Sequence, residues 1–239
     1  LQTHRAGNFW DSFLKALLIM GYRYDVKNIQ DGEIDPERLL ILPCARYLDA
    51  AIQRKIADHV EGGGRLLVYG ELPLFDMTGR ACRELIEALG ITPGEAYRSS
   101  HRYFLSVKPS GLPELATHFA RAFSIEGGEE LAVIAQKGEP CAAIVGSTTV
   151  ITAHFNCNTG FFGRILEGYG LKPKISMTGD SFGVFPVVSV GDRGERLVYV
   201  FNEDNFERRI RLRFEEEPLF GGEELFLRAR EVAVEMNYP

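Results

Sequence analysis

Helical and strand patterns alternate along the chain from about residue 7 to residue 170. Apolar residues recur every three to four positions over residues 8–20, and Gly21 is placed to end that helix. Segments 37–44 and 65–70 are instead nearly unbroken apolar runs, as expected of strands buried within a parallel sheet. The alternation predicts an α/β fold whose parallel strands are joined by right-handed crossovers in a doubly wound sheet.

The segment between these two strands carries clear helix signals. Asp49 is a candidate N-cap, and Ile52, Ile56 and Val60 form one apolar stripe behind it. The three glycines at 62–64 predict where this helix ends.

Further elements follow from the same patterns. Residues 24–29 are predicted to form a strand, and residues 80–90 a helix that ends at Gly90. Three strands are expected between residues 130 and 155, with a hairpin at Gly146-Ser147, and a last helix over 160–170.

The helical period disappears after Pro173. The segment 185–214 contains short strands separated by turns at 191–192 and 202–205, which indicates an antiparallel β appendage. Its arginines alternate with apolar residues in ERRIRLRF, as on the solvated face of a strand. The predicted domains are therefore residues 1–172 and residues 173–239.

Composition narrows the possible partners. The 239 residues carry a net charge of −6, which disfavours binding to a nucleic-acid backbone. No apolar run is long enough to span a membrane, and no signal peptide is expected. The cysteines show neither zinc-site nor disulfide-scaffold spacing, which favours a reducing cytoplasm.

The most suggestive chemistry lies where the strand 65–70 ends. A sharp glycine turn after a buried strand can present a nucleophile beside the backbone N–H groups of an oxyanion hole. Here Gly70 is followed by Glu71, with neither Cys nor Ser beside it. We expect Glu71 to be solvated or bonded to a backbone N–H at the lip of a vacant site, although a carboxylate there could act as a base or a glycosyl nucleophile.

Two other residues could share that edge of the sheet. Cys44 follows the strand 37–44, with Arg46 nearby to lower its pKa, and His154 ends another predicted strand. A structural role is the preferred interpretation of both, because a His base needs a nucleophile and a buried Cys is commonly inert.

Other familiar sites are missing from the pattern. The glycines at 62–64 follow a helix and precede a strand, the reverse of a phosphate-binding loop. No pair of carboxylates is singled out for glycoside hydrolysis, and the chain lacks the eight βα units of a TIM barrel. No cofactor and no metal site is expected.

The segment RLLILPCARYLDAAIQRKIADHVEGGGRLLVYGELPLFD resembles the trimerisation domain of bacterial β-galactosidases of the glycoside hydrolase class. The shared pattern is a buried strand ending in Leu-Pro, a Tyr-Leu lead into a helix, then Val-x-x-Gly-Gly and a second buried strand. RLVYVFNEDNFERRIRLRF is similar to the small β-domain that closes those enzymes.

The resemblance implies a flavodoxin-like domain, similar to class I glutamine amidotransferases, followed by a small antiparallel β-domain. It places Glu71 where the amidotransferase cysteine would be, Cys44 where an oxyanion-loop glycine is frequent, and His154 near the expected histidine. With two departures from that triad, amidotransferase chemistry is not expected.

The resemblance further implies a non-catalytic accessory and oligomerisation fragment of a β-galactosidase-like glycoside hydrolase. Its expected partners are other copies of itself, as a trimer in the parent, and an upstream catalytic TIM barrel. Self-association is also expected from the aromatic residues Phe9, Trp10, Phe161 and Phe162. Two alternatives remain open: a stand-alone amidotransferase-like or sugar-processing hydrolase using Glu71, Cys44 or His154, and a small-molecule binding module.

Overall fold

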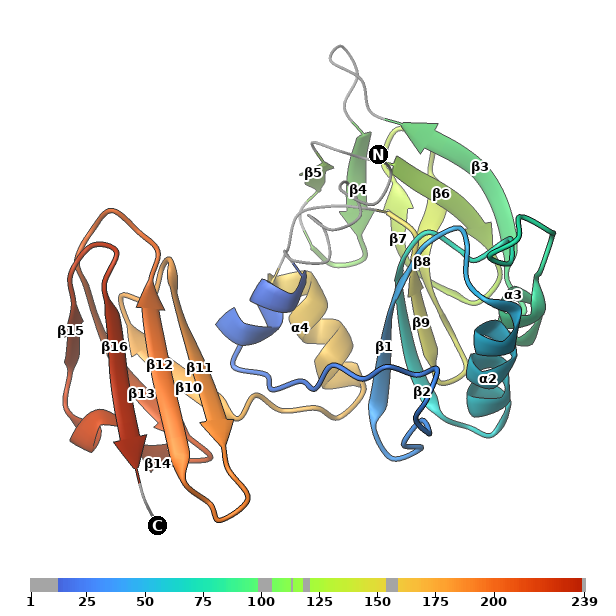
Figure 1. Ribbon diagram of the computed structural model, residues 1–239. Helices are drawn as coiled ribbons and strands as arrows, with labels where there is room; N and C mark the ends of the chain where they lie inside the picture. Colours follow the sequence, from blue (N-terminus) through green and yellow to red (C-terminus); the bar gives the residue numbers. More distant parts are fainter. Residues whose placement is uncertain (1–12, 99–104, 113, 118–120, 154–158, 238–239) are drawn as a thin grey trace. The chain divides into compact units, whose positions relative to one another are not determined.

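A computed structural model describes residues 13–98, 105–112, 114–117, 121–153 and 159–237 (Figure 1). Contacts divide the chain into two compact units, which are described separately. Unit 1 comprises residues 1–12 and 26–161, and unit 2 comprises residues 13–25 and 162–239. The predicted domain boundary at residue 172 stays a prediction.

Unit 1 is built on a seven-stranded mixed sheet with the order β1-β2-β9-β8-β7-β4-β5. The strands are β1 (Leu39–Cys44), β2 (Arg65–Gly70), β4 (Leu105–Pro109), β5 (Leu115–Thr117), β7 (Glu129–Ile134), β8 (Glu139–Val145) and β9 (Thr148–Ile151). Only β1, β2 and β9 are parallel to one another. A separate antiparallel pair consists of β3 (Thr92–Arg98) and β6 (Arg121–Glu126).

The α/β character of this unit is confirmed, and its sheet is mixed. The connection between β8 and β9 is the predicted hairpin at Gly146-Ser147. Two residues can reverse a chain into an antiparallel neighbour, whereas a parallel crossover needs about a dozen residues or more. Short connections join β4 to β5, β7 to β8 and β8 to β9, each in an antiparallel pair.

Helices α2 (Ala50–Glu61) and α3 (Glu84–Leu89) lie side by side against the sheet (Figure 1). Their apolar residues form one core with Leu42, Leu66, Val68 and Val150 of the parallel strands. The predicted cap of α2 is confirmed, because the Asp49 carboxylate accepts a hydrogen bond from Ala51 N at 2.9 Å.

Two predicted elements differ from the structure. The strand predicted at 24–29 does not form: residues 24–28 lack regular structure, and Val26 is 80% exposed. Helix α3 is shorter than predicted, because Ala81 and Cys82 bond in extended conformation to the 74–75 segment. Gly90 ends α3 in the left-handed conformation, as predicted.

Unit 2 contains an antiparallel β-sandwich. One sheet has β10 (Ile175–Gly179), β13 (Arg208–Phe214), β14 (Glu217–Pro218) and β15 (Leu225–Leu227), and the other has β11 (Val184–Val190), β12 (Arg196–Asn202) and β16 (Val232–Asn237). A short 3-10 helix, η1, spans Phe220–Gly222. Valines of the second sheet pack against Ile210, Leu212 and Phe214 of the first. The predicted antiparallel β appendage is thus present.

Helical residues precede the sandwich in the same unit. A helix covers residues 13–19, and Phe13 contacts Phe162 of α4 (Thr159–Gly168) edge-on, with ring centroids 4.8 Å apart. Gly21 then approaches β10 so closely that a Cβ would lie 2.0 Å from Ile175 O. Only glycine permits this contact, which ties residues 13–25 to the β-sandwich.

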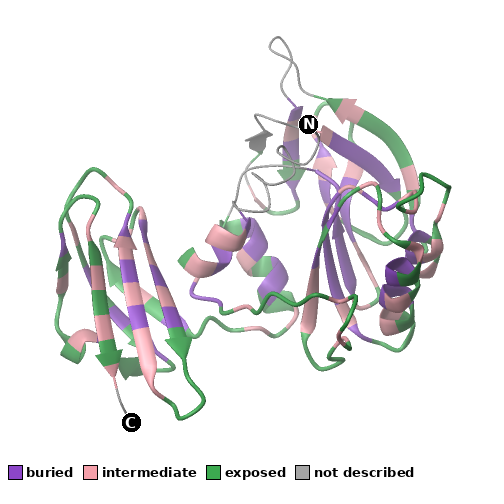
Figure 2. Cartoon of the chain, in the orientation of Figure 1, coloured by how far each residue is buried: buried purple, intermediate pink, exposed green. Residues whose placement is uncertain are grey.

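The aromatic residues expected to mediate self-association do not form an exposed patch. Phe161 and Phe162 are 4% and 1% exposed, so they belong to the core. Both lie in α4, where Figure 2 shows buried positions. Phe9 and Trp10 lie outside the described residues.

Candidate functional site

The glycine turn singled out in the sequence lies where β1 and β2 end side by side, with Cys44 opposite Gly70. Gly70 has a φ of +125°, and a Cβ there would lie 2.6 Å from Cys44 O. The next N–H, that of Glu71, donates to the same carbonyl at 3.0 Å. The turn is therefore shaped by the close approach of the two strands, for which glycine is required.

Glu71 is neither solvated nor held by a backbone N–H, so that expectation was wrong. Its carboxylate forms an ion pair with the Arg121 guanidinium, which comes from the first residue of β6. The Glu71 and Arg121 side chains are only 15% and 20% exposed. Arg121 also lies over the Phe123 ring, 5.1 Å from its centroid.

Arg121 is the site residue that sequence reasoning missed. It follows Glu71 by 50 residues and stands outside any recognisable motif. Only an expectation that a half-buried carboxylate needs a cationic partner would have prompted a search for one.

Cys44 is buried, with its Sγ 3.4 Å from Ala45 O. Burial raises the pKa of the Cys44 thiol far above its ordinary value, and the negative charge of Glu71 raises it further. A reactive cysteine needs the opposite environment, one that stabilises the thiolate. Cys44 is therefore a neutral core thiol at physiological pH.

The residues after β1 form a small aromatic cluster. The Arg46 guanidinium lies over the Phe75 ring at 4.9 Å, and Tyr47 contacts the same ring with centroids 5.5 Å apart. Arg46, which sequence reasoning offered as a partner of Cys44, is engaged with Phe75.

His154 lies outside the described residues. The structure therefore brings together Cys44 and Glu71 of the predicted set and adds Arg121. Glu71 is held there as the partner of a guanidinium, and Cys44 as a neutral thiol. Within the described part of the chain, no His, Cys, Asp or Glu cluster is placed to hold a metal ion.

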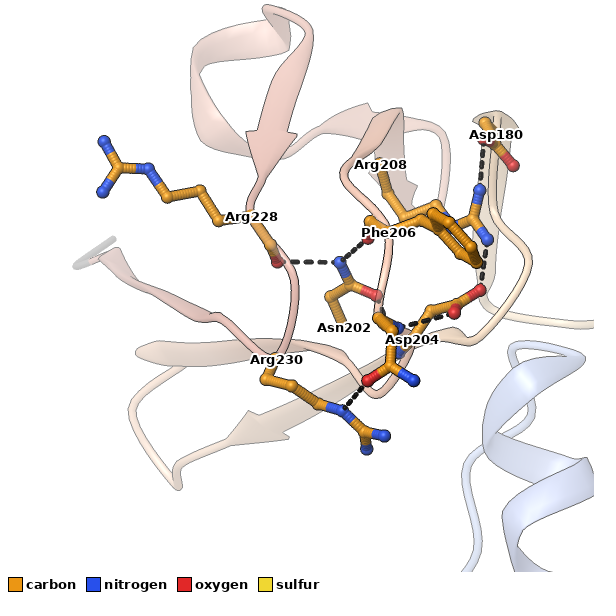
Figure 3. A network of polar contacts seen from close by, with 8 residues as sticks. Asp180, Asn202, Asp204, Phe206, Arg208, Arg228 and Arg230 are labelled. Atoms are coloured by element: carbon orange, nitrogen blue, oxygen red, sulfur yellow. Dashed lines mark hydrogen bonds and ion pairs between the residues drawn. The ribbon is translucent and has the colours of Figure 1, made fainter.

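A second polar cluster lies at one end of the β-sandwich (Figure 3). Arg208 donates to Asp180 at 2.6 Å and also pairs with Asp204. The Asn202 amide donates to Phe206 O and Arg228 O, both at 2.8 Å. These bonds link the loops that follow β10, β12 and β15.

The same cluster has an aromatic rim. The Arg208 guanidinium lies 5.7 Å from the ring centroid of Phe182 and 5.9 Å from that of Phe206. The hydrogen bond from Arg208 holds the pKa of Asp204 below its ordinary value. Because its charges are matched within the cluster, its evident role is to fasten the loops together.

Comparison with known proteins gives the family of this chain and the structures that share its fold. The sequence matches the family described as GLMA-like, second domain, over residues 1–129. The chain belongs to this family. The exo-β-D-glucosaminidase of Pyrococcus horikoshii is 25% identical, in an alignment covering 63% of this chain and 21% of that protein.

Solved structures share the fold over almost the whole chain. A catalytic mutant of Gan42B, a GH42 β-galactosidase from G. stearothermophilus, has a TM-score of 0.75 and 19% identity, covering 98% of this chain and 36% of that one. The β-galactosidase from Rahnella sp. R3 has a TM-score of 0.73 and 18% identity, covering 96% and 36%. The GLMA-like chain thus spans about a fifth to a third of the length of these relatives.

None of the helices in the described ranges is long and apolar enough to cross a membrane.

Proposed function

We propose that this GLMA-like chain is a non-catalytic accessory part of a larger glycoside hydrolase of the β-galactosidase type. The observation that carries the proposal is the state of the glycine turn: Glu71 is paired with Arg121, and Cys44 is a buried neutral thiol. Glycoside hydrolysis needs two carboxyl groups facing each other across the scissile bond. Here the carboxylate at the glycine turn is paired with an arginine instead of facing a second carboxyl group.

The same proposal assigns unit 1 to a flavodoxin-like fold of the class I amidotransferase type, with its active site vacant. Support comes from the parallel strands β1, β2 and β9, from helix α2 crossing between the first two, and from the sharp turn at Gly70. Parallel strands with such a crossover are the core of that fold class.

The larger enzyme would supply an upstream catalytic TIM barrel and assemble as a trimer in the cytoplasm. The relatives' greater length leaves room for a catalytic domain, and the relatives are named as glycosidases. A reducing compartment is supported by the free thiols of Cys44, Cys82 and Cys141.

A panel of nitrophenyl glycosides tests the function directly. We expect the purified 239-residue chain to release no nitrophenol above the buffer rate. Turnover by this chain that disappears in Glu71→Gln would overturn the proposal and establish an enzyme centred on Glu71. Light scattering on the polypeptide that includes the upstream region tests assembly, with a trimer expected.

A further inference from the structure

The β-sandwich of unit 2 has two outer faces of opposite character. On the sheet containing β13, the outward positions include Ser176, Thr178, Arg209, Arg211 and Arg213, which is the expected solvated surface. The predicted wet face of the arginine-rich strand is therefore confirmed. The outer face of the other sheet is instead mostly apolar.

The register of β11, β12 and β16 sets the residues of that second face in three rows across the sheet. We call it the apolar face, and its residues are Phe185, Phe201 and Val232, then Val187, Tyr199 and Val234, then Ser189, Leu197 and Met236. Apart from Ser189, every position is aliphatic or aromatic.

The apolar face is not the core of the sandwich. The alternate positions of the same strands, such as Val184, Val198 and Val200, are the ones packed between the sheets. On the apolar face, Val232 and Val234 are 47% and 55% exposed, and both belong to β16, along which Figure 2 shows exposed positions. Strands with one solvated face normally alternate apolar and polar residues.

The aromatic side chains of the apolar face are already ordered. Phe185 and Phe201 stack with centroids 5.1 Å apart and an interplanar angle of 12°, and Tyr199 stacks on Phe201 at 6.2 Å. Lys15 of the same unit lies over the Phe185 ring at 5.0 Å and pairs with Glu203 at the margin. Rigid aromatic anchors with charge only at the margin are typical of a protein interface.

The size of the face limits its occupant. Three strands about 4.8 Å apart and six residues long, at about 3.3 Å per residue, give a flat footprint of roughly 300 Å², which is a lower bound on the accessible area of the side chains on it. A stable complex of separate proteins buries about 800 Å² on each partner. Domains of one chain are held by interfaces of about 600 Å² and upward in total, about 300 Å² a side, since their linkage supplies a high effective concentration.

We propose that the apolar face is the docking surface for the upstream domain of the same longer polypeptide, a domain that presents an apolar patch of matching size. This proposal rests on the proposed function, which places the chain within a larger enzyme. It is also supported by the chain spanning 36% of the length of the solved β-galactosidases that share its fold.

Thiol labelling tests the proposal with a matched control. Val234→Cys places a reporter on the apolar face, and Arg211→Cys places one on the solvated face of the opposite sheet. Both are made with Cys82 and Cys157 replaced by serine. Maleimide labelling rates, read by mass spectrometry, are compared between the 239-residue chain and the polypeptide that includes the upstream region.

We expect Val234→Cys to react at least tenfold more slowly in the longer polypeptide, and Arg211→Cys to react within about twofold in both. Equal rates for Val234→Cys overturn the proposal. A rate that already falls with concentration in the 239-residue chain also overturns it, because the occupant is then a second copy. Val232→Cys gives an independent reporter on the same face should Val234→Cys fail to fold.

The nitrophenyl panel on the same longer polypeptide separates the two proposals. Glycoside turnover with an unprotected Val234→Cys leaves the accessory function standing and removes the docking surface. Protection of Val234→Cys without glycoside turnover leaves the docking surface standing and removes the accessory function. If the gene encodes nothing upstream of this chain, both the accessory function and the docking surface are wrong.

Discussion

At the scale of single residues, the chemistry of the glycine turn depends on one contact that crosses the unit. Glu71 occupies the position where a nucleophile would stand, and its charge is matched by Arg121. The turn itself could be predicted, because a glycine after a buried strand is a local signal. The ion pair between Glu71 and Arg121 could not be predicted. Arg121 lies far along the chain from Glu71, and its strand β6 pairs with β3, not with β2, so no strand pairing indicates the contact.

Removing the Glu71 carboxylate should destabilise the chain, because it leaves the Arg121 guanidinium largely buried without its partner. We expect Glu71→Ala to lower the free energy of unfolding by about 1–3 kcal/mol, measured by urea denaturation. Glu84→Ala is the matched control, since its ion pair with Arg54 has side chains 36% and 64% exposed. It should cost clearly less than Glu71→Ala, because water screens an exposed ion pair. Equal small losses in both variants would show that Glu71 behaves as a surface residue.

A methyl group at Gly70 should be poorly tolerated. Gly70→Ala forces a Cβ to within 2.6 Å of Cys44 O at a φ of +125°. Gly79→Ala is the control, because Gly79 also has positive φ, +84°, but nothing lies within 4 Å of its Cβ position. We expect Gly70→Ala to cost about 1–3 kcal/mol more than Gly79→Ala in urea denaturation. Equal costs would mean that the strands separate freely at this point.

At the scale of elements, local signals were the most reliable guide. The Asp49 cap, the strands β1 and β2, and the hairpin at Gly146-Ser147 were all predicted, because each depends on neighbouring residues. The strand expected at 24–29 failed because a strand needs a partner, which a short apolar pattern cannot guarantee. The loop-fastening cluster around Arg208 was missed because its members come from three separate loops.

That cluster should make the β-sandwich sensitive to acid. The pKa of Asp204 in the folded chain lies below its ordinary 3.8, mainly through the Arg208 hydrogen bond. A depressed pKa adds stability that is complete well above pH 3.8 and is lost as the pH falls through the folded-state value.

The variant Asp204→Asn tests whether the stability contributed by the Asp204 carboxylate is lost as the pH falls. We expect the variant to unfold at lower urea than the parent at pH 7, with the difference shrinking as the pH falls below 3.8. Unfolding midpoints followed by circular dichroism across this range provide the measurement. A difference that stays constant with pH would show that the Asp204 charge contributes nothing to the fold.

At the scale of the whole chain, family membership and fold were within reach of the sequence, because the segment 38–76 carries a recognisable pattern. The mixed sheet was only partly foreseen, because strand direction depends on connection lengths more than on apolar periodicity. The apolar face of unit 2 was not noticed at all. Its strands contain valines at both inward and outward positions, so their pattern resembles a buried sheet.

Turnover by the longer polypeptide shows whether Glu71 takes part in the chemistry. The measurement is kcat/KM for a nitrophenyl glycoside in the parent and in Glu71→Gln, at a temperature where both are folded. We expect values equal within about twofold, because the proposed function assigns the reacting carboxylates to another domain. A loss of a hundredfold or more in kcat would contradict it and place Glu71 among the reacting groups.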